Sequence, residues 1–99
     1  MKRHLFVYGT LKSPKIQKSV FGRITKGRPD VLEGYKKSKI MIDKKRYPIL
    51  IPNKRSLVKG LVISVTPDEL KTIDKYETDS YKRTQIVLKS GKIAWVYQK

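Results

Sequence analysis

The sequence contains no cysteine and only one histidine, His4. The absence of thiols excludes a disulfide framework and any thiolate metal site. Long apolar runs are also missing, because no stretch approaches the roughly 18 apolar residues of a membrane-spanning helix. The apolar run at residues 5–8 is far shorter than the roughly 7–15 residues of a signal-peptide core. We therefore expect a soluble, cytoplasmic protein with no membrane association.

Acidic residues are scarce as well. Eight residues are Asp or Glu against 24 Lys and Arg, which makes the formal net charge +16. Residues 1–65 hold 17 of the basic residues and three of the acids, so +14 of the excess lies there. Basic clusters at 36–37, 44–46 and 54–55 are typical of nucleic-acid contacts or of a solvated surface. Because the clusters are short and separate, we expect only weak, non-specific nucleic-acid binding.

Familiar catalytic and cofactor motifs are missing too. A Ser-His-Asp triad would have to use His4, whose neighbours Arg3 and Leu5 offer no partner, so we interpret His4 as an ordinary strand-edge residue. Residues 8–10 read Tyr-Gly-Thr and lack the further glycines and the Gly-Lys-Ser/Thr of a P-loop. No group of side chains has the spacing of a metal site. The sequence therefore predicts neither a metal nor an organic cofactor.

What is present is mainly a series of short apolar and alternating runs, which are typical of strands. The runs expected to form strands are residues 5–8, 23–26, 31–42, 47–51, 57–65, 84–88 and 93–97, of which 31–42 would form one or two strands interrupted at Gly34. Gly60 is a candidate bulge, and Ser90-Gly91 is a candidate hairpin turn. No repeat, linker or low-complexity segment divides the chain. We expect residues 1–99 to form a single, strand-rich domain of the α+β class.

Two helices are expected among these strands. Ser13 and Pro14 are typical of the start of a short helix, whose inward residues would be Ile16, Val20 and Phe21. The main helix is expected over residues 67–77, with a proline at its first position. Thr66 and Glu69 form the Thr-x-x-Glu pattern of a capping box at its start.

One carboxyl group stands out at the end of the main helix. Glu77 lies about two turns after Leu70, on the face that Leu70 and Ile73 must bury. Partial desolvation, the negative end of the helix dipole and nearby Asp74 would each raise its pKa. A carboxyl group with a raised pKa suits general acid/base catalysis near neutral pH. The alternative is a solvated glutamate where the helix frays.

Several short motifs follow one another in a recognisable order. The chain opens with Leu-Phe-Val-Tyr-Gly-Thr-Leu-Lys at residues 5–12 and continues with Tyr-Pro-x-Leu-x-Pro at 47–52. Val-Lys-Gly-Leu-Val-Ile follows at 58–63, and the segment 70–84 contains Asp-x-Tyr-Glu and then Tyr-x-Arg-Thr. The chain closes with Ala-Trp-Val-Tyr at 94–97. Together these motifs resemble the gamma-glutamylcyclotransferase-like (AIG2-like) family over essentially the whole chain.

The resemblance implies a small, mixed-strand, barrel-like sheet with the helix of residues 67–77 packed beside it. It implies that Glu77 is the catalytic acid/base residue. Arg83 would either serve the pocket or form a structural ion pair with an acid. The substrate-binding residues that it implies are Tyr8, Gly9, Thr10, Leu11 and Tyr81.

The activity implied by the resemblance is cyclisation of a gamma-glutamyl amine or peptide to 5-oxoproline, with release of the amine. The substrate's own α-amine attacks its γ-carbonyl, so the reaction is intramolecular. A single carboxyl group and a set of N–H donors are sufficient, and no metal or cofactor is required.

Two segments depart from the family pattern. Residues 13–18 replace the Arg-Gly and Asn-His that many relatives carry, and residues 78–80 form a short connection before Tyr81. Both border the expected pocket, so the identity of the substrate stays open. Two alternatives to the enzyme are a non-catalytic small-ligand binding module and a basic nucleic-acid-associated protein on the same fold.

Overall fold

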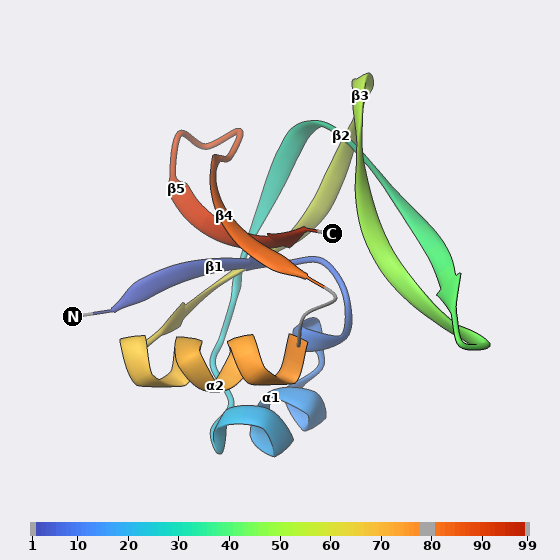
Figure 1. The fold of residues 1–99 in the computed structure, drawn as a ribbon. Coiled ribbons are helices and arrows are strands. Elements are labelled where there is room, and N and C mark those ends of the chain that lie inside the picture. Colours follow the sequence, from blue (N-terminus) through green and yellow to red (C-terminus); the bar gives the residue numbers. More distant parts are fainter. Residues whose placement is uncertain (1, 78–80, 99) are drawn as a thin grey trace.

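Within residues 2–77 and 81–98, which the computed structural model describes, the chain forms a five-stranded sheet and two α-helices (Figure 1). The elements in chain order are β1 (Arg3–Val7), the 3-10 turn η1 (Thr10–Lys12), α1 (Pro14–Phe21), β2 (Arg28–Ile42), β3 (Lys45–Val65), α2 (Pro67–Glu77), β4 (Lys82–Val87) and β5 (Ile93–Gln98). The strand order is β2-β3-β1-β5-β4. β1 and β5 pair in parallel, whereas the other neighbours pair antiparallel. The predicted α+β class with a mixed sheet is thus confirmed.

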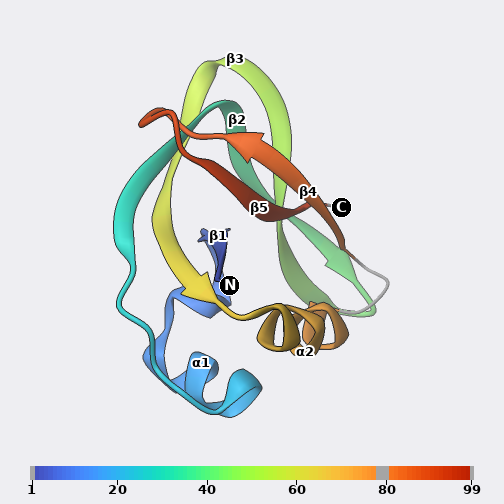
Figure 2. The same ribbon diagram turned by 90° about the vertical axis from the view of Figure 1, so that its left-hand side faces the viewer.

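The sheet curves strongly, and its two ends approach each other (Figure 2). The Lys89 N–H donates a hydrogen bond of 2.8 Å to the carbonyl oxygen of Val31, which joins the β4–β5 turn to β2. Ser90 Oγ donates to Asp30 Oδ2 at 2.6 Å beside this link. These contacts give the sheet the expected barrel-like form. Both helices lie below the sheet in Figure 1 and pack against each other.

Side chains alternate across the sheet and build two apolar clusters. Leu5 and Val7 of β1 point toward the helices and pack with Leu70 and Ile73 of α2. Phe6, between them in sequence, belongs to the cluster on the other face, together with Leu32, Val58, Val62 and Val96. The helices are therefore held by one core, and the curvature of the sheet encloses the other.

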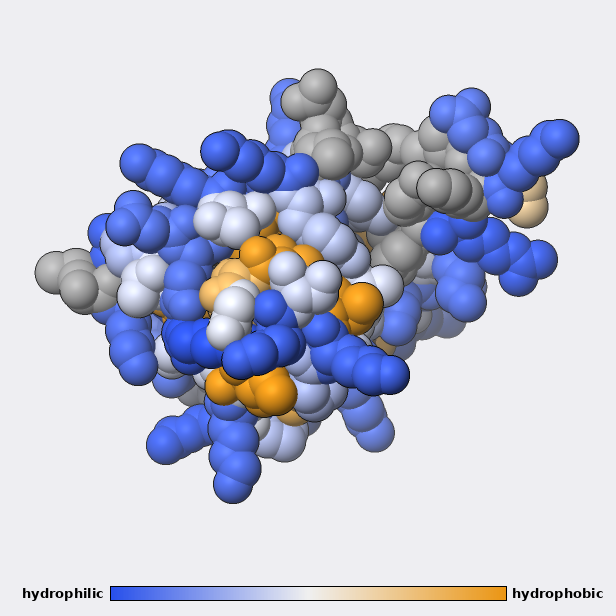
Figure 3. Space-filling model, turned by 90° about the horizontal axis from the view of Figure 1, so that it is seen from below, coloured by the Kyte–Doolittle hydropathy of each residue, from blue (hydrophilic) through white to orange (hydrophobic). Residues whose placement is uncertain are grey.

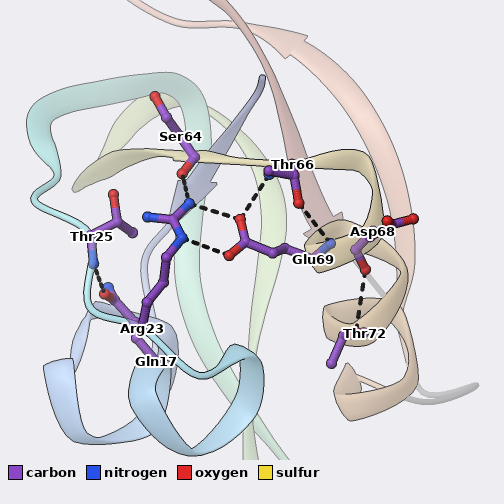
Figure 4. Close-up of polar contacts among 8 residues, drawn as sticks. All are labelled: Gln17, Arg23, Thr25, Ser64, Thr66, Asp68, Glu69 and Thr72. Atoms are coloured by element: carbon purple, nitrogen blue, oxygen red, sulfur yellow. Dashed lines mark hydrogen bonds and ion pairs between the residues drawn. The ribbon is translucent and has the colours of Figure 1, made fainter. Parts of the chain in front are cut away.

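The predicted helix starts are largely confirmed. Thr66 Oγ1 accepts from the Glu69 N–H at 3.1 Å, while the Thr66 N–H donates to Glu69 Oε1 at 2.8 Å, which is the expected capping box (Figure 4). Pro14 begins α1 as expected, although the Ser13 side chain makes no cap hydrogen bond. The inward residues of α1 are those predicted, since all three pack against the core: Ile16, Val20 and Phe21.

One predicted strand is absent, and two others are confirmed as strand but belong to a single element. Residues 23–26 form no strand, because the Thr25 N–H donates to the buried side chain of Gln17 at 2.9 Å. Residues 47–51 and 57–65 do not form two strands, because both lie in the continuous β3. The predicted turn at Ser90-Gly91 is confirmed, with Gly91 at φ 89° and its N–H bonded to Leu88 O at 2.8 Å.

The predicted bulge at Gly60 was also wrong. The register shift between β2 and β3 falls between Glu33 and Tyr35 instead. Gly60 has a different role, because a Cβ atom there would lie 2.5 Å from Val7 O and 2.8 Å from Phe6 Cζ. Glycine thus lets β3 cross close to β1. None of the helices in the described part of the chain is long and apolar enough to span a membrane.

Candidate active site

Glu77 is the last residue of α2, and its position on the helix brings it to the edge of the core. Leu70 and Ile73, on the same face, are 3% and 0% exposed, as the spacing predicted. Glu77 itself is half-buried. Burial raises the pKa of its carboxyl group from 4.5 to about 7. The group is therefore able to exchange a proton near neutral pH.

Asp74 was expected to contribute to this shift, but burial is its cause. The Asp74 carboxylate is engaged elsewhere: Arg83 donates to it from Nε at 3.0 Å and from Nη2 at 3.1 Å. Tyr97 OH also donates to Asp74 Oδ1, at 2.6 Å. The guanidinium group offsets the charge of Asp74, so it adds little repulsion at Glu77. The structural ion pair predicted as one role for Arg83 is confirmed.

Arg83 also holds Trp95 in this network, because its Cζ lies 4.4 Å from the centroid of the indole ring. The sequence analysis did not single out Tyr97 or Trp95 as members of the site's surroundings. Their alternation on one face of β5 was the available signal, since residues 95 and 97 must point to the same side. The network joins the last turn of α2 to the adjacent strands β4 and β5.

The loop that follows β1 reaches the same end of α2. Thr10 Oγ1 and Tyr76 OH share a hydrogen bond of 3.2 Å, although 66 positions separate them in sequence. Tyr8 OH donates to the carbonyl oxygen of Tyr97 at 2.8 Å. Burial, together with the nearby Tyr81 and Glu77 side chains, raises the pKa of the Tyr8 phenol. The structure therefore brings the predicted residues Tyr8, Thr10, Glu77 and Tyr81 into one neighbourhood.

The backbone of this loop is shaped by η1. The Lys12 N–H donates to Gly9 O at 3.1 Å, and the Ser13 N–H donates to Thr10 O at 3.0 Å. The N–H groups of Thr10 and Leu11 precede these bonds and are not used by the turn. The Leu11 side chain is buried in the core, so what Leu11 offers to a ligand is its backbone.

Gln17 is a positioning residue that the sequence analysis missed. It is 2% exposed, and its Nε2 donates to Leu11 O at 2.8 Å. Its Oε1 accepts from the Thr25 N–H at 2.9 Å. The signal was available, because Gln17 lies beside Ile16 and Val20 on the face of α1 that had to be buried. A buried amide with both ends bonded holds the loop against α1.

Other expected features lie outside this neighbourhood. His4 is at the opposite end of β1 from the loop, and its buried Nδ1 has no hydrogen-bond partner among the residues that the structure describes. Within the same residues, no three His, Cys, Asp or Glu side chains form a group that could hold a metal ion. The connection at residues 78–80, which departs from the family pattern, lies outside the described residues. The chemistry available among the described residues is that of one carboxyl group and backbone donors, beside phenols that are already hydrogen-bonded.

Fold and site together define a small α+β protein with a single-carboxyl candidate site at the junction of a helix end and a loop. The family model described as gamma-glutamyl cyclotransferase, AIG2-like, matches residues 5–99. AIG2-like protein C from Arabidopsis thaliana is 31% identical over 83 residues, which are 83% of this chain and 47% of that protein. This chain belongs to the gamma-glutamyl cyclotransferase, AIG2-like family, as its motifs predicted.

Solved structures support the same fold. A protein from Arabidopsis thaliana, known from a solution structure, has a TM-score of 0.80 at 24% identity, covering 99% of this chain and 62% of that one. A gamma-glutamyl cyclotransferase has a TM-score of 0.79 at 12% identity, covering 99% and 66%. The chain spans about half the length of the curated relatives that it matches.

Proposed function

We propose that this chain is a gamma-glutamyl cyclotransferase, which converts a gamma-glutamyl amine or peptide to 5-oxoproline and the free amine. The observation that carries the proposal is the half-buried carboxyl group of Glu77, whose pKa burial raises to about 7. This group lies beside a loop with available backbone donors, in a chain of the family that contains such enzymes.

The reaction moves two protons from the α-ammonium nitrogen to the leaving nitrogen, and one carboxyl group can carry both in turn. Ionised Glu77 takes a proton from the substrate's α-ammonium group, and the freed amine then attacks the γ-carbonyl carbon. A C–N bond forms and the carbonyl oxygen becomes an oxyanion. Protonated Glu77 next gives its proton to the leaving nitrogen, the original amide bond breaks and the oxyanion becomes the carbonyl of the new ring. Ionised Glu77 then takes the second proton from the attacking nitrogen and passes it to the released amine, so that 5-oxoproline and the protonated amine leave and Glu77 is ionised again. A pKa of about 7 lets Glu77 act in both directions near neutral pH.

The loop after β1 supplies the second requirement, which is stabilisation of the oxyanion. In this proposal the N–H groups of Thr10 and Leu11 donate to it, and Gly9 allows the substrate to approach the backbone closely. Tyr8 and Tyr81 line the same neighbourhood and contribute to substrate binding. Gln17 contributes indirectly, since its bond to Leu11 O sets the orientation of the loop.

The test is to replace Glu77 with glutamine and measure 5-oxoproline release from a panel of gamma-glutamyl amino acids and gamma-glutamyl alkylamines. A glutamine side chain at this position cannot exchange the proton, so we expect kcat to fall by about 10²–10⁴-fold. Asp68→Asn is the matched control, because Asp68 is an exposed acid at the far end of the same helix. Its activity should equal that of the unmodified protein.

The kcat/KM of the unmodified enzyme should also rise through an acid limb near pH 7, because Glu77 must be ionised to start the reaction. Two outcomes contradict the proposal. Equal turnover in the Glu77→Gln variant removes Glu77 from the chemistry. Saturable binding of gamma-glutamyl compounds with no 5-oxoproline formed by the unmodified protein identifies a non-catalytic binding module.

A further inference from the structure

The longest feature of the fold has no part in the candidate site. Residues 35–42 of β2 pair with residues 45–52 of β3 in one uninterrupted antiparallel ladder. β1 pairs with β3 only at residues 61–65, well beyond this ladder. We call residues 35–55 the ribbon arm. Figure 1 shows its far half at the right of the molecule, standing apart from β1, β4 and β5.

The ribbon arm carries a disproportionate share of the positive charge. Its 21 residues contain eight of the chain's 24 Lys and Arg residues and one of its eight acids, which is +7 of the net +16. The ion pairs found among the described residues lie elsewhere, between Arg23 and Glu69 and between Arg83 and Asp74. For the side chains of the arm that the structure describes, the charge is therefore left to solvent ions or to a partner.

The basic side chains point to both faces of the arm. Side chains alternate along each strand, and the pairing places Arg46 opposite Met41, on the face shared by Lys37 and Lys39. Lys36 belongs to the other face, opposite Ile51. All of these basic side chains are exposed. Seen from below, hydrophilic side chains project in several directions at the right of the molecule, which is the side where Figure 1 shows the arm (Figure 3).

Like charges are also crowded where the arm approaches the body. The pKa of Lys37 is lowered, first by partial burial of its amine and then by the neighbouring Lys12 and Lys39. Lys12 belongs to η1, so the positive surface continues from the arm to the loop beside α2. Same-sign charges held this close repel one another unless an anion lies between them.

We propose that the ribbon arm is a nucleic-acid binding element that contacts the phosphate backbone without reading base sequence. A two-stranded ribbon is narrow enough to enter the major groove, which is about 12 Å wide. Phosphates line both walls of a groove, so cations on both faces of the ribbon can be used there. A flat anionic membrane meets only one face, which is why nucleic acid fits this arm better.

The experiment compares two variants that lose the same charge. One carries Lys37→Gln, Lys39→Gln and Arg46→Gln in the arm. The other, called the body variant, carries Lys18→Gln, Lys71→Gln and Lys89→Gln, which are exposed positions outside residues 35–55. Binding to a labelled 20-base-pair DNA duplex of random sequence and to single-stranded RNA is followed by fluorescence anisotropy, at salt concentrations of about 50–200 mM.

We expect the unmodified protein to bind with a Kd of about 10⁻⁶–10⁻⁴ M that weakens steeply with salt. The arm variant should bind at least tenfold more weakly. Its slope of log K against log salt should fall by about three, one unit for each lost phosphate contact. The body variant should stay within about threefold of the unmodified protein. A Lys37→Arg, Lys39→Arg variant should keep full affinity, which separates loss of charge from loss of folding.

Three outcomes would overturn the proposal. Equal losses in the arm and body variants would mean that the whole cationic surface binds, with no special role for the arm. Absence of binding by the unmodified protein at about 50 mM salt would leave the lysines as protection of an exposed sheet edge. The arm variant could lose binding to phosphatidylserine vesicles while it keeps full nucleic-acid binding. This result would identify a membrane surface as the partner of the arm.

Discussion

At the scale of single residues, the surroundings of each acid decide what it can do. Glu77 and Asp74 lie on the same helix, three positions apart, yet their environments differ. Asp74 is bonded to Arg83 and Tyr97, so its charge is compensated. Glu77 is half-buried, and the loss of solvent around its carboxyl group raises its pKa to about 7. The two carboxyl groups on one helix thus differ in how their charge is compensated and in their pKa because their surroundings differ.

The raised pKa of Glu77 makes a prediction for stability. Its folded pKa of about 7 lies above the unfolded value of 4.5, so ionisation destabilises the folded state. The free energy of unfolding should fall as the pH rises from 4.5 through 7, and Glu77→Gln should remove this loss. We expect the variant's Tm to exceed that of the unmodified protein at pH 8 by several degrees, at roughly 4–8 °C per kcal/mol.

The two proteins should have nearly equal Tm values at about pH 4, where Glu77 is largely protonated in both the folded and the unfolded state. Thermal melts at both pH values, monitored by circular dichroism, provide this comparison in one pair of proteins. A variant that is less stable than the unmodified protein at pH 8 would mean that Glu77 is held in a stabilising ion pair.

At the scale of elements, α2 is anchored at both ends by contacts to distant strands and loops. At its start, Glu69 closes the capping box and accepts from Arg23 Nε at 2.6 Å and from Nη2 at 2.7 Å (Figure 4). Arg23 Nη2 also donates to Ser64 O at 2.9 Å. At its end, Tyr76 bonds to Thr10 in the loop after β1. The helix is thereby held along the sheet with Glu77 beside that loop.

Glu69→Gln should weaken this anchor at its charged contact. Glutamine can keep the capping box, but it loses the ionic partner of Arg23. Because Arg23 is half-exposed, we expect a loss of about 1 kcal/mol at pH 7. The hydrogen bond from Arg23 lowers the pKa of Glu69. The stabilisation from the Arg23–Glu69 pair is therefore fully present above the pKa of Glu69 in the unfolded state. It is lost as the pH falls through the lower pKa of Glu69 in the folded state.

The difference between Glu69→Gln and the unmodified protein should accordingly shrink in strongly acidic buffer. Urea melts at pH 7 and at about pH 3, below the usual glutamate pKa, measure it. Glu33→Gln is the control, since Glu33 is exposed on β2 and joins no ion pair among the described residues. A constant difference at both pH values would assign the effect to the cap alone.

At the scale of the whole molecule, charge is the dominant unusual property. A net charge of +16 on 99 residues is repulsive in a folded domain with a radius of gyration of 13.0 Å. The Debye length is about 10 Å at 0.1 M salt, which is comparable with the size of the molecule. Screening should therefore relieve much of the repulsion between distant lysines.

We expect the Tm to rise by several degrees when sodium chloride is increased from about 20 mM to about 300 mM at pH 7. The arm variant that lacks three cations should show a smaller rise, because it starts with less repulsion. Differential scanning calorimetry measures both. A Tm that falls with salt would mean that ion pairs such as Arg23–Glu69 outweigh the general repulsion.

The sequence by itself determined those features that depend on near neighbours in the chain. The start of α2, the inward faces of both helices and the Ser90-Gly91 turn follow from spacing and residue type, and the structure confirms them. The position of Glu77 on the buried face of α2 follows from helical periodicity in the same way. The order of the motifs was sufficient to predict the family and the α+β class.

Only the tertiary structure decided what depends on residues far apart in sequence. Asp74 is neutralised by Arg83 across the β4 contact, which leaves burial as the cause of the raised pKa of Glu77. The region 23–26 is not a strand, because Gln17 binds the Thr25 N–H. β3 runs unbroken from Lys45 to Val65, because β2 pairs with it at residues 45–52 and 57–62 and β1 pairs with it at residues 61–65. Local patterns do not record such partners, since each is chosen by packing after the chain has folded back on itself.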